Sequence, residues 1–182
     1  MNELKLNETP VRTSRNFNIN NIKLENINIP EDVEEFNNIE IIGQDPKIDI
    51  QTNVDDFNLT YGLGEILTSQ VKAKSNKKMK IVVNSKIKND LQIDFNIDEK
   101  NLNLIENIEI VANENTKSTI ILKYESINNI EAFHNGIINL IAKQNSKINV
   151  IIINLLSQNS NNFLSIQNTF EENADAKFTI VD

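Results

Sequence analysis

The side chains that most often carry chemistry are few in this sequence. There is no cysteine, which excludes a disulfide framework, a metal held by thiolates and a cysteine nucleophile within this chain. His134 is the only histidine, and a metal role would need further ligands beside it. Aspartate and glutamate partners stay open at this stage, but we favour an imidazole that caps a strand or packs beside Phe133. We therefore predict no catalytic, cofactor-binding or metal-binding residue.

The hydroxyl and carboxylate groups form no arrangement that is typical of a site. The run Thr-Ser-Arg at residues 13–15 has no base in a recognisable relation to it. The aspartate pair at residues 55–56, and Asp94 with Asp98, lack the glycine-containing spacing of a calcium loop. We interpret these aspartates as parts of solvated strand faces.

Glycine and lysine do not indicate a phosphate site either. The sequence Tyr-Gly-Leu-Gly-Glu at residues 61–65 lacks a third glycine, and no Gly-Lys-Ser or Gly-Lys-Thr follows it. We interpret it as a corner that leads into residues 65–73. The lysine-rich stretch at residues 72–88 has no interleaved aromatics, and the net charge is −8. Nucleic acid needs a concentrated basic surface, so we predict a solvated surface of strands and corners instead.

Nothing in the sequence indicates a membrane segment. The first eight residues are polar and do not resemble a secretory leader. The longest apolar run, at residues 150–153, is far too short to span a bilayer. We expect a soluble, cytoplasmic protein with no nucleic acid and no membrane among its partners.

A short segment recurs through the second half of the chain. Asn-Thr-Lys-Ser-Thr-Ile-Ile at residues 115–121 is echoed by Asn-Ser-Lys-Ile-Asn-Val-Ile at residues 145–151. Looser copies stand at residues 173–180 and 76–82, and the last two steps are 30 and 28 residues long. A repeat of this length indicates one structural unit stacked on its neighbours, here a β-solenoid.

Composition agrees with a solenoid of short strands. Isoleucine is β-branched and favours strands, and asparagine tolerates the left-handed backbone of tight corners. Ile120, Val150 and Phe178 hold similar places in successive repeats, so we expect all three to point inward. The predicted strands are residues 79–83, 91–97, 105–111, 118–124, 136–142, 148–155, 163–170 and 176–181.

We divide the chain into two parts. Residues 1–59 form an N-terminal segment with short strands, expected near residues 17–24, 39–42 and 48–51. After Pro30, residues 31–36 fit either one helical turn or a solvated acidic loop. Residues 60–182 form the β-helix coils, which we expect to be truncated at the C-terminal end.

The repeats resemble the SufB/SufD family of iron–sulfur cluster assembly proteins. The resemblance is carried by residues 107–115, by Lys-Tyr-Glu-Ser at residues 123–126, by residues 133–145 and by residues 173–180. Weaker likeness lies at residues 9–13 and 20–24. The family implies a right-handed parallel β-helix, hence a mainly all-β fold after a short irregular or α+β N-terminal segment. It also implies a cytoplasmic scaffold that is not an enzyme.

The resemblance further implies protein partners. In a full-length protein these are a SufB/SufD-type paralogue and a SufC-like ABC ATPase, and the cluster forms where two β-helices meet. The family's cluster-associated cysteine and histidine match no position here, so no site residue is carried over and we expect no cofactor in this chain. The sequence ends at Asp182 without the helical region on which the ATPase docks. We therefore expect either the N-terminal part of a longer protein or a short paralogue, with self-association through the open β-helix end.

Two other functions are compatible with a β-solenoid. A carbohydrate-binding or carbohydrate-active solenoid would need clustered carboxylates and exposed aromatic platforms for sugar rings. The two arginines lie near the N-terminus and aromatic residues make up 5% of the chain, so this alternative is disfavoured. The remaining reading is a purely structural repeat domain.

Overall fold

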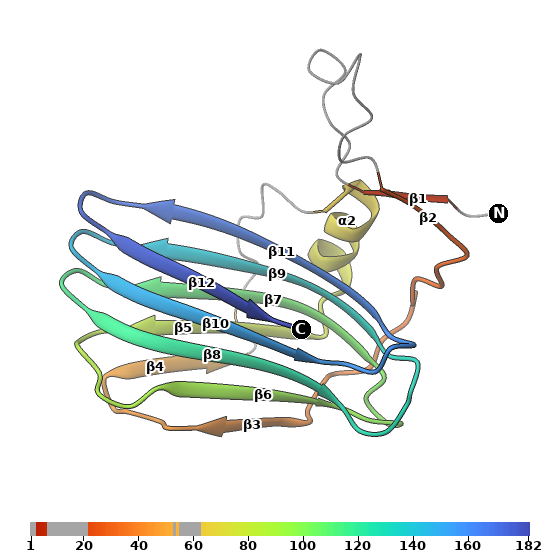
Figure 1. The fold of residues 1–182 in the computed structure, drawn as a ribbon, viewed down its shortest axis with the longest axis horizontal. Helices are drawn as coiled ribbons and strands as arrows, with labels where there is room; N and C mark the ends of the chain where they lie inside the picture. Colours follow the sequence, from red (N-terminus) through yellow and green to blue (C-terminus); the bar gives the residue numbers. More distant parts are fainter. Residues whose placement is uncertain (1–2, 7–21, 53, 55–62) are drawn as a thin grey trace, which may run out of the picture.

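The chain folds as a β-solenoid of about four turns, made of two five-stranded sheets that face each other (Figure 1). The computed structural model describes residues 3–6, 22–52, 54 and 63–182. The first sheet, here the β8 sheet, has the order β12-β10-β8-β6-β3. The second, the β7 sheet, has the order β11-β9-β7-β5-β4. The chain passes from one sheet to the other at each corner.

The eight coil strands lie where the sequence predicts them. In the β8 sheet they are β6 (Leu91–Ile97), β8 (Lys117–Ser126), β10 (Lys147–Leu155) and β12 (Asp175–Val181). In the β7 sheet they are β5 (Lys77–Val83), β7 (Asn103–Ala112), β9 (Phe133–Ala142) and β11 (Asn161–Phe170). All coil strands pair in parallel with the strand of the next coil. The predicted parallel β-helix is confirmed.

The expected register is also confirmed. Ile120 pairs with Leu91 on one side and Val150 on the other, and Val150 pairs with Phe178. Ile120 and Val150 are fully buried, and Phe178 packs against the same core while remaining half-buried in the last coil. Because strand side chains alternate between faces, every second residue enters the lumen between the sheets and forms one continuous aliphatic stack.

Asparagine residues occupy the corners between strands, as the asparagine-rich composition of the chain predicts. Asn115, Asn145 and Asn173 occupy equivalent positions just before β8, β10 and β12, with φ of 60°, 59° and 57°. This left-handed conformation is costly for most L-residues but accessible to asparagine. Each repeat therefore begins with the same backbone turn.

Two N-terminal strands extend the sheets at one end of the stack. β3 (Ile39–Ile42) pairs antiparallel with β6, and β4 (Ile48–Thr52) pairs antiparallel with β5. Gly43 lies between β3 and β4 with φ +76°, where a Cβ would stand 2.2 Å from the Asp90 carbonyl oxygen. β3 and β4 thus extend both sheets, while the rest of the described N-terminal segment precedes the coils as expected.

The remaining N-terminal pieces cover the outside of the β7 sheet. β1 (Glu3–Leu6) and β2 (Ile22–Glu25) form an antiparallel ribbon whose leucines pack with Phe133 and Phe163. The strand expected at residues 17–24 falls mostly outside the described residues. Residues 31–38 are irregular and contain no helical turn, so the loop alternative holds.

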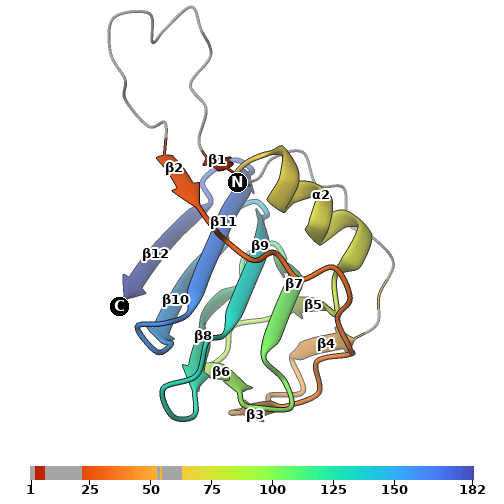
Figure 2. The ribbon, with the colours of Figure 1, turned by 90° about the vertical axis from the view of Figure 1, so that its right-hand side faces the viewer.

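One helix was missed by the sequence analysis. α2 (Glu65–Lys74) occupies residues that we interpreted only as the stretch after a corner. Its residues favour helix, but its apolar face is narrow, so no helical period was evident. Leu67 and Val71, one turn apart, are buried against the β7 sheet (Figure 2). Tertiary burial, rather than a strong local pattern, stabilises this helix.

Candidate functional site

Three chemistry-bearing side chains meet inside the solenoid. Glu106 of β7, Tyr124 of β8 and His134 of β9 all point into the lumen, where their exposed fractions are 0%, 1% and 0%. The Tyr124 hydroxyl donates to Glu106 Oε1 over 2.5 Å. His134 Nε2 lies 3.3 Å from the same oxygen. We call this group the lumen cluster.

The backbone register explains why these residues meet. Glu106 pairs with Gly136 of the next coil, two residues beyond His134. A Cβ on Gly136 would stand 2.8 Å from Glu106 Oε1 and 2.9 Å from both His134 Nε2 and Leu164 Cδ1. Glycine therefore leaves the space in which the carboxylate and the imidazole lie. A glycine inside a strand marks such a close approach.

Aromatic rings form one wall of the cluster. The Tyr124 and His134 rings stack with centroids 4.4 Å apart and an interplanar angle of 29°. Phe95 of β6 also stacks on Tyr124, with ring centroids 5.1 Å apart and an interplanar angle of 12°. The stack crosses the lumen from the β8 sheet to the β7 sheet and fixes the orientation of the imidazole.

Both ring nitrogens of His134 have hydrogen-bond partners. Nδ1 lies 2.7 Å from Asn162 Oδ1 in the following coil, while Nε2 faces Glu106. The two contacts hold the imidazole between successive coils, with the Tyr124 ring stacked on it.

Burial shapes the other members of the cluster. Desolvation, followed by the charge of Glu106, raises the pKa of the Tyr124 phenol well above its ordinary value, so the phenol stays neutral and donates. Glu106 Oε2 is buried and has no hydrogen-bond partner. Burying an unsatisfied carboxylate oxygen lowers the stability of the fold. The contacts of the other oxygen, Oε1, with Tyr124 and His134 offset this cost.

The lumen cluster is sealed, which decides what it can do. With no exposed surface on its three members, no substrate reaches it in this conformation. It connects three successive coils through Glu106, His134 and Asn162, and so it specifies their alignment. Among the described residues, no three His, Cys, Asp or Glu side chains are grouped to hold a metal ion.

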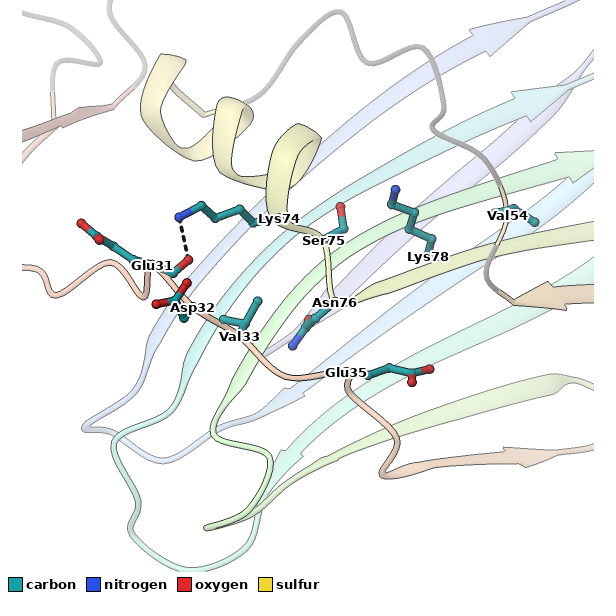
Figure 3. A pocket seen from close by; sticks show the side chains of 9 residues that line it. All are labelled: Glu31, Asp32, Val33, Glu35, Val54, Lys74, Ser75, Asn76 and Lys78. Carbon is teal, nitrogen blue, oxygen red and sulfur yellow. Dashed lines mark hydrogen bonds between the residues drawn. The ribbon is translucent and has the colours of Figure 1, made fainter.

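A surface pocket lies between the acidic N-terminal segment and α2. Its volume is about 610 Å³, and Figure 3 shows its labelled lining. Lys74 Nζ donates to the Glu31 carbonyl oxygen over 2.6 Å. The Ser75 hydroxyl donates to the Val71 carbonyl, a bond within the last turn of the helix. The Ser75 hydroxyl is thus bonded to the backbone. The pocket is lined by both acidic side chains and lysines, and none of them forms a nucleophile–base pair with Ser75.

The lysine-rich stretch does not form one basic surface. Lys80 Nζ pairs with Glu109 Oε1 at 2.8 Å, and Lys74 is bonded to the backbone of residue 31. Lys77 is only 7% exposed; burial lowers its pKa, opposed by the Glu35 carboxylate. The interpretation of a wholly solvated surface is therefore wrong for Lys77 and holds for its exposed neighbours.

The aspartates considered as possible calcium ligands lie at a corner and on a strand. Asp98 accepts bonds from Asn101, Lys100 and Asn38 at a corner, and the Asn101 side chain is the main cause of its lowered pKa. Asp94 lies on the outer face of β6 and accepts a hydrogen bond from the Gln92 side chain, but it is only 7% exposed, so the interpretation as a solvated strand face is wrong for it. Residues 13–15 and 55–56 lie outside the described residues.

His134 does not cap a strand as we favoured, since it points into the lumen beside a carboxylate. The carboxylates left open by the sequence were possible metal ligands, and neither Glu106 as a hydrogen-bond partner nor Tyr124 as a stacking partner of His134 was predicted. The signals were present in the sequence. Glu106 stands at an inward position of an otherwise apolar alternation, and Gly136 interrupts a strand 30 residues later.

Comparison with known proteins gives one match. The family described as "SUF system FeS cluster assembly, SufBD core domain" matches residues 95–182, which begin within β6 and include β7 to β12. No curated protein and no solved structure matches the chain. Among the described residues, no helix is long and apolar enough to cross a membrane. Residues 95–182 thus match a SufBD core domain, and this match supports membership of the SufB/SufD family.

Proposed function

We propose that this protein is a scaffold subunit of a SUF-type complex that assembles iron–sulfur clusters. The observation that carries the proposal is the family match over residues 95–182, which coincides with the parallel coils. The nascent cluster is the cargo of such a complex rather than a resident cofactor of this chain. A role in iron–sulfur cluster assembly follows from the family; the scaffold role is our proposal.

The chemistry of the described residues supports a non-catalytic role. The histidine, its carboxylate partner and the tyrosine are sealed in the lumen. The chain has no thiolate to accept sulfide or iron. We therefore propose that this protein acts through partners in the cytoplasm: a SufB/SufD-type paralogue, and through the complex a SufC-like ABC ATPase.

The test is co-expression of the tagged chain with the SufB/SufD-type and ABC ATPase proteins of the same genome. We expect the paralogue and then the ATPase to co-elute with the chain in size-exclusion chromatography. Depleting the chain in its own cells should lower the activity of enzymes that need a [4Fe–4S] cluster. A dehydrogenase without a cluster is the matched control. No complex and unchanged cluster enzymes would refute the proposal.

A further inference from the structure

The chain contains a single Asn-Gly step, at Asn135 and Gly136 in β9. In such a pair the glycine nitrogen can attack the amide carbon of the asparagine, because glycine has no side chain to block the approach and permits the backbone conformation that ring closure needs. The new C–N bond closes a succinimide ring, and Asn135 Nδ2 leaves as ammonia with the proton of the Gly136 amide. Water then opens the ring to give aspartate or isoaspartate.

Both residues of this reactive pair are required by the fold. A Cβ on Gly136 would stand 2.8 Å from Glu106 Oε1, so the lumen cluster demands glycine there. Asn135 points outward from the same strand, where Nδ2 donates to the Leu67 carbonyl oxygen over 3.0 Å and to Gln70 Oε1 over 2.8 Å. One residue thus leaves room inside the solenoid, and the other attaches α2 to its outside.

The folded chain holds this pair in an unreactive state. Asn135 is only 2% exposed, beneath α2, which crosses the outer face of the β7 sheet (Figure 2). Gly136 lies in the paired part of β9, opposite Glu106 of β7 and Leu164 of β11. An extended strand commits its backbone nitrogens to the sheet and directs its side chains away from them. Ring closure therefore needs α2 to release the Asn135 amide and β9 to bend at the glycine.

Helix α2 is attached less firmly than the coils. Its buried apolar residues are Leu67 and Val71, whereas each inner coil strand is paired along both of its edges. Elements with few buried apolar contacts open at a lower free energy than the core strands. We therefore expect α2 to leave the sheet while the coils remain folded.

We propose that Asn135 is a site of spontaneous deamidation that becomes reactive only when α2 leaves the β7 sheet, and that the product keeps α2 from returning. An aspartate at this position has no proton to donate, and it would face the Leu67 carbonyl and Gln70 Oε1, which are both acceptors. Burying that charge without a partner is unfavourable. Chemical modification of the open form makes a reversible opening permanent. The site is independent of the proposed function and goes beyond it.

The first test measures deamidation at Asn135 by peptide mapping with mass spectrometry, during incubation of the full chain in mildly alkaline buffer. Leu67→Ala and Gln70→Ala each weaken the attachment of α2 without changing the reactive pair. Each should raise the rate at Asn135 at least about tenfold, because the rate follows the population of the open form. Ile66→Ala, on the same helix at a site 53% exposed, is the matched control and should leave the rate unchanged.

The second test examines the product through Asn135→Asp. Amide hydrogen exchange in residues 65–74 should become at least about tenfold faster than in the wild-type chain, while exchange in β8 and β10 stays the same. Asn135→Ser, which keeps a donor and adds no charge, should have a smaller effect.

Four results would overturn the proposal. The first is deamidation of Asn135 in the folded chain as fast as in the urea-unfolded chain, and the second is a rate that neither Leu67→Ala nor Gln70→Ala changes. The third is an Asn135→Asp protein in which α2 exchanges as slowly as in the wild type. The fourth is loss of protection in β8 and β10 of that protein, since it would show that Asn135 holds the coils rather than the helix.

Discussion

Glu106 and His134 face each other inside the solenoid with 3.3 Å between Oε1 and Nε2, and neither exposes any surface to solvent. The two residues come from successive coils and are 28 positions apart. Their contact turns a repeat that is nearly uniform in its aliphatic residues into one with a unique alignment. A coil that slipped by two residues toward the C-terminus of β9 would place the carboxylate opposite Ile138.

Removing one member of this pair should be strongly destabilising. Glu106→Ala leaves the buried Tyr124 hydroxyl and His134 Nε2 without their shared partner, and we expect a loss of about 1–3 kcal/mol in the free energy of unfolding for each unsatisfied group. Urea denaturation of Glu106→Ala, His134→Ala and the double variant gives the coupling. If the pair is real, the double variant costs less than the sum of the two single ones. Strict additivity would show that the residues do not interact.

Gly136→Ala should be destabilising because its methyl group meets three atoms at 2.8–2.9 Å. Overpacking of this kind typically costs about 1–3 kcal/mol. The nearest obstacle is Glu106 Oε1, so the cost should shrink in a Glu106→Ala background. Thermal unfolding of the four proteins measures this difference. An unchanged cost in both backgrounds would mean that the backbone, not the carboxylate, demands glycine.

The coils could be predicted because every repeat carries its own local signals. Asn115, Asn145 and Asn173 mark the corners, and apolar alternation marks the strands that follow. Helix α2 could not be predicted in this way, since it is stabilised by burying Leu67 and Val71 on a distant sheet. Its narrow apolar face stabilises a helix only when the β7 sheet is present to cover it.

The lumen cluster was missed for a related reason. Glu106 in isolation is one acid among many, and His134 lacks ligands along the sequence. Their contact depends on the register between β7 and β9. Because the repeats vary in length, the sequence does not fix this register to within one residue. Gly136 is the one position whose sequence could have indicated the cluster, because a glycine inside an isoleucine-rich strand often marks the close approach of a neighbouring group.

Tyr124 should make stability fall at alkaline pH. Burial raises its pKa in the folded state above that of the unfolded chain. Its contribution is therefore fully present below about pH 10, the ordinary pKa of tyrosine, and is lost as the pH rises further, because only the unfolded state releases the proton. Tyr124→Phe should flatten this decline between about pH 10 and 11. Equal slopes for the two proteins would show that the phenol is not held neutral.

Val150→Asp should lower the free energy of unfolding far more than Thr119→Asp on the neighbouring strand β8. Val150 is 0% exposed in the lumen, whereas Thr119 points outward from β8 and is partly exposed. Burying an unpaired carboxylate costs several kcal/mol, so Val150→Asp should unfold or lose most of its stability, while Thr119→Asp should remain close to wild type. Chemical denaturation of both variants checks the inward register of β10.

The chain alone should hold neither iron nor an iron–sulfur cluster tightly. It offers no thiolate, and its one imidazole is engaged with Asn162 and Glu106 inside the lumen. Iron–sulfur clusters are held mainly by cysteine thiolates, with histidine as an occasional substitute. Anaerobic reconstitution with ferrous iron and sulfide, followed by desalting, should therefore leave no stoichiometric charge-transfer absorption. The Glu106→Gln protein is the matched comparison, because it loosens the imidazole without adding a ligand. A stoichiometric brown species in the wild-type chain that His134→Ala abolishes would contradict the prediction and would mean that the lumen opens to admit metal.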